Sequence, residues 1–323
     1  MHKHADMLSL SQLSRIEFAD LLGMAAAQRL DRCDYALAGK NLALIFEKPS
    51  LRTRVTFEVA IRQLGGWPIL LGSIESRLGE RESIPDLARN LSLWVDGIVA
   101  RVFKHVDLEE MASFASVPVI NALSDWEHPC QALADILSLW DEWRGAFDGK
   151  TVAYVGDWNN VSRSLWKACE LSGLGFRAIC PAGYGPAEGE NPAWFTEADA
   201  VEGANAIYTD VWASMGQEDE LEARVEVFRP YQVNERLMAK AGKDCLFMHC
   251  LPAHRGLEVT DGVIDSERSI VFQQAANRLP SEKAILVSLL ESDHEASEEG
   301  RTRVFGRFGH LDHHSVAQGK LWM

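Results

Sequence analysis

The chain has 323 residues, 47% of them hydrophobic, with a formal net charge of −15 and a pI of about 5.1. This length exceeds what one hydrophobic core usually holds, so we expect two domains. No cluster of Lys and Arg stands out, which makes nucleic acid an unexpected partner. No apolar run approaches membrane-spanning length, and the N-terminus lacks the apolar core of a signal peptide, so we expect a cytoplasmic protein without membrane contact.

The cysteines also argue against two classes of protein. Six cysteines are scattered along the chain without Cys-x-x-Cys spacing. This spacing favours neither a zinc site nor a disulfide scaffold, and reduced, buried thiols are the expected state. Histidines gather only near the two termini, and nothing else indicates a metal, so we expect neither a metal nor a cofactor.

Short apolar runs alternate with helical periodicity along the chain. Strands are predicted at residues 41–46, 117–121, 151–155, 176–180, 205–209 and 245–248. Helical spacing follows the first three runs, and Gly65-Gly66 and Gly173 mark helix ends. Such alternation predicts parallel sheets covered by helices, here two doubly wound α/β domains.

The string Phe-Glu-Lys-Pro-Ser-Leu-Arg-Thr-Arg at residues 46–54 follows the first predicted strand. It places two hydroxyls and two arginines at the expected start of a helix. Free N–H groups there attract anions, and Arg adds a planar fork of charge-assisted donors, so the string suits a phosphate dianion. Taken alone, the residues fit an ordinary helix start with solvated arginines equally well.

The string His-Pro-Cys-Gln at residues 128–131 offers an imidazole and an amide. These groups suit a small polar carbonyl, and with the first string they indicate a pocket for a compact phosphorylated electrophile. A lone His before Pro more often stabilises a loop. Arg101 ends another apolar run, where it could equally be a surface arginine.

One later string and two later residues are open to more than one interpretation. Residues 156–160, Gly-Asp-Trp-Asn-Asn, follow a strand, but the G-x-G-x-x-G fingerprint of a dinucleotide fold is absent. Asp210 could be a helix N-cap. Cys250 beside His249 could be a thiol nucleophile.

Four motifs, at residues 50–54, 128–131, 210–216 and 249–252, each follow a predicted strand. Two precede residue 150 and two follow it. Open parallel sheets bind ligands beyond the carboxyl ends of their strands. We therefore expect an active-site cleft between the two domains, each of which supplies one substrate.

The four motifs resemble those of the aspartate/ornithine transcarbamylase family, which usually carry Ser-Thr-Arg-Thr-Arg and His-Pro-Xaa-Gln. Asp-Val-Trp-Ala-Ser-Met-Gly at 210–216 and His-Cys-Leu-Pro at 249–252 are similar to the amino-acid-binding motifs of its ornithine branch. The resemblance reaches about residue 290. It implies a carbamoyl-phosphate-binding domain at 1–147, joined by a final helix at about 281–291, and an ornithine-binding domain at 148–280. A polar tail, 292–323, lies outside it.

The resemblance also assigns roles to residues. The implied catalytic residues are Arg101, His128, Cys250 and Arg278. The implied carbamoyl-phosphate ligands are Ser50, Leu51, Arg52, Thr53, Arg54, Arg77, Arg101, His128, Gln131, Cys250, Leu251 and Arg278. The implied ornithine ligands are Asn160, Asp210, Ser214 and Met215. Arg77 lies on a polar loop, 72–83, that would reach a neighbouring subunit of a homotrimer or a multiple of trimers.

The implied reaction transfers a carbamoyl group from carbamoyl phosphate to the δ-amine of L-ornithine by direct attack. Two departures keep alternatives open. Leu51 stands where the ornithine branch usually has Thr, and some N-acylornithine relatives also carry an apolar residue there. Arg77 stands in place of Gln, and it could equally be a solvated loop residue. Another acceptor (N-acylornithine, putrescine or aspartate), a weakly catalytic binding paralogue and a nicotinamide oxidoreductase are the alternatives.

Overall fold

The computed structural model describes residues 5–29, 35–48, 50–72, 78–213 and 218–291. The chain divides into two compact units. The first comprises Met1–Ala146 and Asn277–Met323, and the second comprises Phe147–Ala276. Within the described residues, no helix is both long enough and apolar enough to cross a bilayer.

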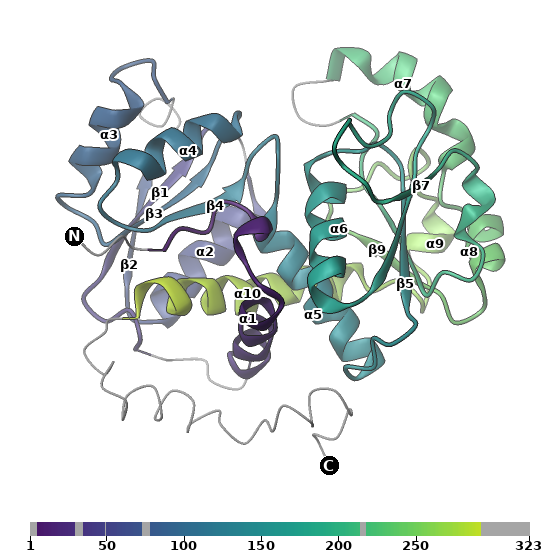
Figure 1. Ribbon diagram of the computed structural model, residues 1–323, viewed down its shortest axis with the longest axis horizontal. Coiled ribbons are helices and arrows are strands. Elements are labelled where there is room, and N and C mark those ends of the chain that lie inside the picture. The colour runs from purple at the N-terminus through teal and green to yellow at the C-terminus, as the bar shows by residue number, and fades with distance from the viewer. Residues whose placement is uncertain (1–4, 30–34, 49, 73–77, 214–217, 292–323) are drawn as a thin grey trace. The chain divides into compact units, whose positions relative to one another are not determined.

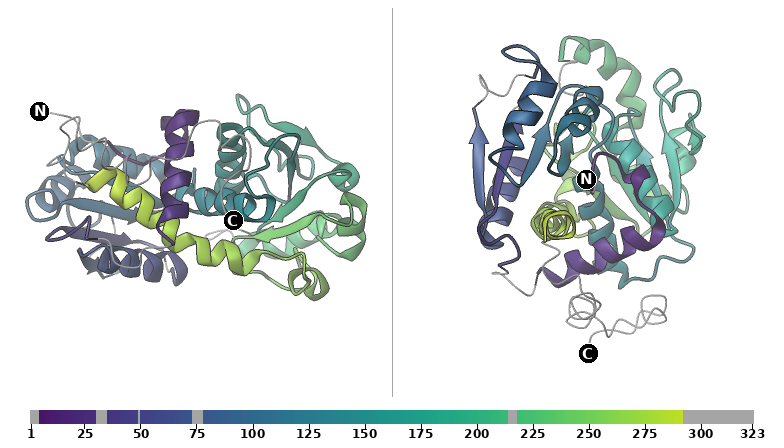
Figure 2. Two further views of the ribbon diagram at one scale, coloured as in Figure 1. Left: turned by 90° about the horizontal axis from the view of Figure 1, so that it is seen from below. Right: turned by 60° about the vertical axis from the view of Figure 1, so that its left-hand side comes forward.

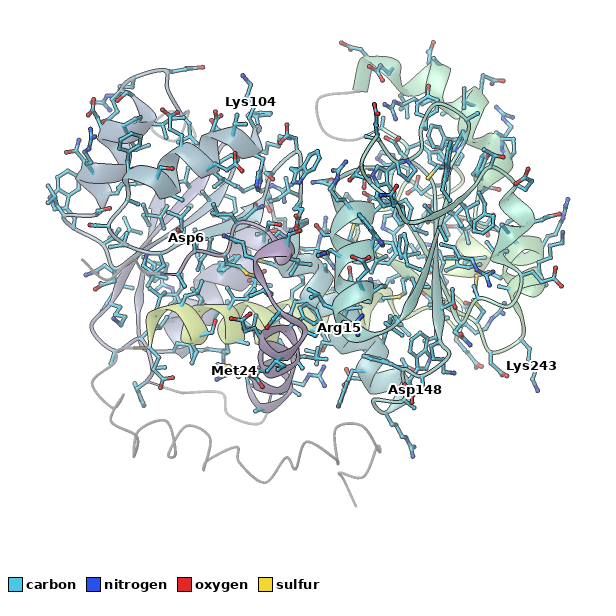
Figure 3. All side chains as sticks on the ribbon, viewed as in Figure 1. Asp6, Arg15, Met24, Lys104, Asp148 and Lys243 are labelled. Atoms are coloured by element: carbon cyan, nitrogen blue, oxygen red, sulfur yellow. The ribbon has the colours of Figure 1, made fainter. Side chains whose placement is uncertain are left out.

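The first unit is built on a four-stranded parallel sheet in the order β2-β1-β3-β4 (Figure 1). Its strands are β1 (Asn41–Phe46), β2 (Trp67–Leu71), β3 (Gly97–Arg101) and β4 (Val119–Leu123). Its helices are η1 (Leu10–Gln12), α1 (Arg15–Ala27), α2 (Arg52–Gln63), α3 (Ile84–Leu91), α4 (His105–Phe114), α5 (Pro129–Trp143) and most of α10 (Val271–Leu290). A capping box between Ser14 and Glu17 starts α1, whose Arg15 and Met24 are labelled in Figure 3.

Alternate residues of the first sheet face opposite layers. Ala43 and Ile45 of β1 pack in one cluster with the apolar residues of α3 and α4. On the other face, Gly97 leaves room for α10, because a Cβ atom there would lie 3.0 Å from the Leu290 side chain. Arg101 lies four residues beyond Gly97 on the same strand, so its side chain belongs to the α10 face. Figures 1 and 2 show α10 as the long yellow-green helix.

The final helix starts ten residues earlier than the sequence suggested. The resemblance placed this helix at about 281–291. In the structure α10 runs from Val271 to Leu290 with Pro280 inside it. The helix therefore carries Asn277 and Arg278, which belong to the first unit.

The second unit has a five-stranded parallel sheet in the order β7-β6-β5-β8-β9. Its strands are β5 (Thr151–Val155), β6 (Gly175–Ile179), β7 (Ala193–Phe195), β8 (Ala206–Thr209) and β9 (Leu246–His249). Its helices are α6 (Asn160–Ser172), η2 (Ala198–Val201), η3 (Glu218–Glu220), α7 (Leu221–Phe228), η4 (Arg229–Tyr231), α8 (Glu235–Ala241) and α9 (Asp261–Ile264).

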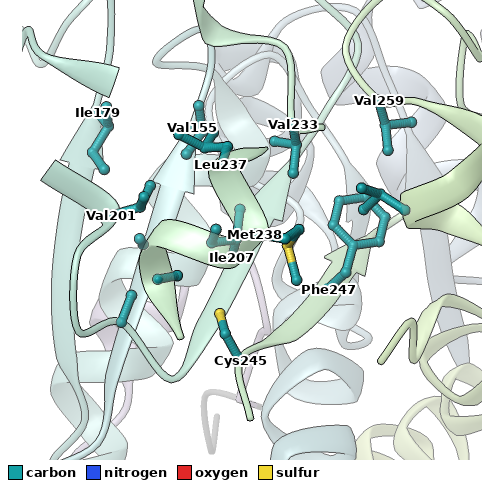
Figure 4. Packing of buried hydrophobic residues seen from close by; sticks show 14 of the residues in the cluster. Val155, Ile179, Val201, Ile207, Val233, Leu237, Met238, Cys245, Phe247 and Val259 are labelled. Carbon is teal, nitrogen blue, oxygen red and sulfur yellow. The ribbon is translucent and has the colours of Figure 1, made fainter. Parts of the chain in front are cut away.

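The core of the second unit covers both faces of this sheet. On one face, Leu237 and Met238 of α8 pack with Val155, Ile207 and Phe247 of three strands (Figure 4). A smaller cluster around Cys180 also includes Trp158, Ala178 and Phe176 of the β5–β6 region, with Trp166 of α6. The two units are thus parallel-sheet α/β domains, and the predicted fold class is confirmed.

Candidate active site

The segment that joins β1 to α2 presents helix N–H groups without a side-chain cap. Leu51 occupies the N-cap position of α2, makes no capping hydrogen bond and is 75% exposed. The first turn of α2 carries Arg52, Thr53 and Arg54, and the Arg54 Nε lies 3.5 Å from the Glu58 Oε1. Uncapped N–H groups and the positive end of the helix dipole favour an anion here.

Thr53 joins three elements of the first unit. Its buried hydroxyl oxygen accepts a hydrogen bond from the Arg278 Nη2 of α10 at 3.1 Å. A second, longer contact of 3.5 Å comes from the Arg101 Nη1 at the end of β3. Two guanidinium groups therefore converge on the first turn of α2, where the sequence predicted a phosphate.

Gln131 of α5 joins this group. Its Oε1 accepts a hydrogen bond from the Arg278 Nη1 at 2.8 Å, and its Nε2 donates to the Asp135 Oδ1 at 2.8 Å. The Arg278 Nη2 also pairs with the Glu282 Oε1 at 2.7 Å. All four side chains are buried, so the guanidinium orientation is fixed by partners from α2, α5 and α10.

His128 immediately precedes α5 and is buried. Burial lowers its pKa well below the ordinary value of 6.5, and the positive charges of Arg278, Arg101 and Arg52 lower it further. The imidazole is therefore neutral at physiological pH. A neutral imidazole beside three arginines can donate a hydrogen bond to a carbonyl without competing for a proton.

The second unit carries a separate cluster around Asp210, which directly follows β8. The Asn159 Nδ2 donates to its Oδ2 at 3.0 Å, and the Cys250 Sγ donates to its Oδ1 at 3.2 Å. No helix begins in the described residues directly after Asp210, so the N-cap interpretation is unsupported. Asp210 is buried, and both of its carboxylate oxygens accept hydrogen bonds from neutral donors.

His249 shapes the turn that contains Cys250. Its Nδ1 accepts the Leu251 backbone N–H at 2.9 Å, and its Nε2 lies 3.3 Å from the Glu258 Oε1. Leu251 has a φ of 58°, a conformation that costs a non-glycine residue about 1 kcal/mol or more and that this hydrogen bond helps to hold. Because both ring nitrogens are engaged, His249 is not the base that a thiol nucleophile needs.

The hydrogen bond at the His249 Nδ1 also disfavours metal binding. Ligand atoms of Asp210, His249 and Cys250 lie within 4.8 Å of one another, a grouping that could hold an ion. The imidazole lone pair already accepts the Leu251 N–H, so a metal would have to displace that bond. This donor set therefore fits an orienting role better than a metal site.

The N-terminus of α6 adds Asn160, which is half-buried and opens the helix. Asn159 caps it through its Oδ1, which accepts the N–H groups of Val161 at 2.9 Å and Ser162 at 3.0 Å. Nearby, the Arg224 Nη1 donates to the Asp157 Oδ2 at 2.7 Å and to the Trp212 carbonyl at 3.0 Å. Arg224 thus fastens the segment after Asp210 to the end of β5.

The structure brings the predicted residues together in two clusters, one in each unit. The first unit gathers Ser50, Leu51, Arg52, Thr53, Arg54, Arg101, His128, Gln131 and Arg278. The second unit gathers Asn160, Asp210, Cys250 and Leu251. Arg77, Ser214 and Met215 lie outside the described residues, as does the tail at 292–323.

Several residues that support these clusters were not found from the sequence. They are Glu47, Asp135, Asn159, Arg224, Glu258 and Glu282. The spacing of Asn159 and Ser162 is that of a capping box, so the role of Asn159 at the start of α6 could have been predicted from the sequence. Glu47 accepts the backbone N–H groups of Leu78 at 2.8 Å and Phe103 at 2.9 Å, so it anchors the described end of the loop that carries Arg77.

One domain thus gathers arginines that suit an anion, and the other holds a carboxylate beside a thiol. Comparison with known proteins identifies the class. Residues 5–141 match the family model "Aspartate/ornithine carbamoyltransferase, carbamoyl-P binding domain", and residues 148–289 match its "Asp/Orn binding domain". The chain belongs to the aspartate/ornithine carbamoyltransferase family.

Relatives narrow the class. The chain is 47% identical over 297 residues to an ornithine carbamoyltransferase of Shewanella oneidensis, a match that covers 87% of this chain and 98% of the relative. It is 46% identical over 303 residues to an anabolic ornithine carbamoyltransferase of Pyrococcus furiosus, covering 88% and 96%. The solved ornithine carbamoyltransferase of Pyrococcus furiosus superposes with a TM-score of 0.84 and 46% identity, covering 89% of this chain and 97% of that one.

Proposed function

We propose that the chain transfers the carbamoyl group of carbamoyl phosphate to the δ-amine of L-ornithine, giving L-citrulline and phosphate. The observation that carries the proposal is the Thr53 hydroxyl, on which Arg101 and Arg278 converge beside the neutral His128. This arrangement suits a ligand that combines a phosphate dianion with a carbonyl, as carbamoyl phosphate does. The family models, which name carbamoyl phosphate and Asp/Orn as ligands, support it.

Catalysis in this proposal rests on positioning and on charge stabilisation. Arg101, Thr53 and His128 polarise the carbonyl as the amine attacks its carbon. Arg278 with Arg52 and Arg54 stabilises the phosphate as the C–O bond to it breaks. Ser50, the Leu51 backbone and Arg77 complete the phosphate ligands. Gln131 holds Arg278 in place and itself faces the carbamoyl group.

The second cluster would hold ornithine. Asp210 pairs with the α-ammonium group, and Asn160, Ser214 and Met215 bind the α-carboxylate and the backbone of the amino acid. Cys250 and the Leu251 carbonyl orient the δ-amine. That amine must lose a proton before it attacks, so the rate rises with pH over the range in which this proton leaves.

We also propose a homotrimer, or a multiple of trimers, in the cytoplasm, with a role in arginine biosynthesis. The trimer is what the family resemblance implies, with Arg77 on a loop that would serve a neighbouring subunit. Reduced cysteines suit a cytoplasmic location, and Cys130, Cys169, Cys180, Cys245 and Cys250 form no disulfides. The word anabolic in the name of the Pyrococcus furiosus relative supports the biosynthetic role.

A competition assay tests the proposed function. The purified chain is given carbamoyl phosphate with ornithine, N-acetylornithine, putrescine or aspartate, and each carbamoylated product is quantified. Citrulline as the dominant product supports the proposal. A preference for N-acetylornithine would instead favour the acceptor that Leu51 left open, and no product with any acceptor would favour a binding paralogue.

A further inference from the structure

Glu282 is a fully buried carboxyl group one helical turn beyond Arg278 on α10. Its Oε1 accepts the Arg278 Nη2 at 2.7 Å, the same nitrogen that donates to Thr53. Its Oε2 is buried and has no hydrogen-bond partner among the described residues. One oxygen therefore orients the guanidinium, while the other lies in a site where a negative charge is poorly stabilised.

Burial raises the pKa of Glu282 to about 7, although the Arg278 charge and the Thr56 hydroxyl act in the opposite direction. The group therefore exchanges its proton near neutral pH.

The groups that face Glu282 come from three helices. Arg278 of α10 is its ion-pair partner, and Cys130 of α5 interacts with its charge. Asp135 of α5 interacts with the charge of Arg278. Burial raises the pKa of the Cys130 thiol, so this thiol stays neutral near pH 7. From α2, the interacting group is the uncharged Thr56.

We propose that Glu282 is a positioning residue that holds Arg278 in the free enzyme and takes up a proton from solvent when the phosphate dianion of carbamoyl phosphate binds. The proposal rests on the function proposed above. The arriving dianion competes for the Arg278 charge and repels the buried carboxylate, so the Oε2–H bond forms. Glu282 is then neutral, and the ligand is the anionic partner of the arginine. Ligand binding and protonation are thereby linked, and affinity falls as pH rises above 7.

The test is calorimetric titration of the intact enzyme with carbamoyl phosphate in several buffers of different ionisation enthalpy. The dependence of the binding enthalpy on the buffer gives the number of protons taken up. It is measured for the unaltered enzyme, for Glu282→Gln, and for Glu110→Gln, a matched change at an exposed position of α4. Protons exchanged by the ligand itself are common to all three and cancel in the differences.

We expect the unaltered enzyme and Glu110→Gln to take up a fraction of a proton near pH 7.5 that Glu282→Gln does not. Their dissociation constant should rise by up to about tenfold per pH unit above 7, the limit for one linked proton, and stay nearly flat in Glu282→Gln. Equal proton numbers in all three proteins would overturn the proposal. A purely structural Glu282 would change affinity without changing the proton number.

The experiment separates the two proposals. If the unaltered enzyme does not bind carbamoyl phosphate, the proposed function fails. If it binds with no proton uptake from pH 6.5 to 8.5, the function stands and the role of Glu282 is wrong. This second outcome needs no variant, so it decides the matter even if Glu282→Gln does not fold.

Discussion

The Cys250 thiol donates to the Asp210 carboxylate at 3.2 Å, which joins the end of β9 to the end of β8. A thiol that serves a carboxylate in this way is not prepared for nucleophilic attack. The contact instead links the group proposed for the α-ammonium of ornithine to the group proposed for its δ-amine. The acceptor would then be gripped at both ends by residues of one domain.

The first prediction concerns the acceptor. Asp210→Asn replaces a charge-assisted contact with a neutral one, a loss of about 1.5–3 kcal/mol, or about ten- to hundredfold in the KM for ornithine. The KM for carbamoyl phosphate should change far less. Steady-state kinetics with each substrate varied check this, with Asp244→Asn, an exposed position of the same domain, as control. Equal losses for both substrates would count against the assignment.

Arg52 provides the second prediction. Arg52→Ala should nearly abolish turnover and weaken carbamoyl phosphate binding at least tenfold without unfolding the protein, because it removes a guanidinium from the uncapped start of α2. Arg62→Ala, in the last turn of the same helix, is the matched control and should leave binding unchanged. Calorimetry and melting curves provide the measurements. Unchanged affinity in a folded Arg52→Ala protein would disprove the phosphate site.

The third prediction follows from the lowered pKa of His128. Because burial and three arginines disfavour the imidazolium, His128 should remain neutral from pH 8 down through its ordinary value of 6.5. Its imidazole signal in NMR spectra, assigned by comparison with His128→Gln, should not shift over this range in the folded, ligand-free protein. A titration centred near pH 6.5 would contradict the buried, arginine-flanked environment.

Stability provides the fourth prediction. Glu282 has a pKa of about 7 in the folded state and 4.5 as its reference value, so between these values the folded state binds more protons than the unfolded state. Stability from this group therefore falls as pH rises from about 5 to 8. The melting temperature should drop less over this range in Glu282→Gln than in the unaltered protein. Identical slopes for the two proteins would show that Glu282 does not titrate there.

The fifth prediction concerns assembly. If Arg77 serves a neighbouring subunit, mixing Arg77→Ala with Arg52→Ala subunits should restore activity, because some sites then receive both arginines unaltered. Mass spectrometry must first confirm mixed trimers of two inactive parents. No recovery in such trimers would disprove the shared site, and full activity of Arg77→Ala alone would favour a solvated loop.

Much of the fold followed from the sequence because buried strands and helix stops leave local signals. The runs at 41–46 and 151–155 became β1 and β5 with the same bounds, and Gly173 ends α6 in the left-handed conformation. Three strands were not predicted: the edge strands β2 and β7, and the central strand β3, where the apolar run before Arg101 was noted without being assigned as a strand. Pro68 lies within β2, where a missing N–H is tolerated only at an edge, and β7 has only three residues.

The motifs of the candidate site are visible in the sequence, but the residues that support them are not. Arg101, His128 and Arg278 stand out through chain order and resemblance, whereas Glu282 and Glu258 gain their roles from partners on other elements or across a turn. From sequence alone, a Glu within a long helix is expected to be exposed to solvent. The structure shows instead that the Glu282 carboxyl group is buried beside Arg278. Burial by residues that are distant in the sequence cannot be predicted from the few residues around a position.

The most direct test of the proposed function is citrulline formation by the purified chain from carbamoyl phosphate, with ornithine, N-acetylornithine, putrescine and aspartate as competing acceptors. The proposed function predicts that ornithine is carbamoylated in preference to every other acceptor and that phosphate appears in equal amount. Carbamoylation of another acceptor in preference to ornithine, or no phosphate release with any of them, would contradict it.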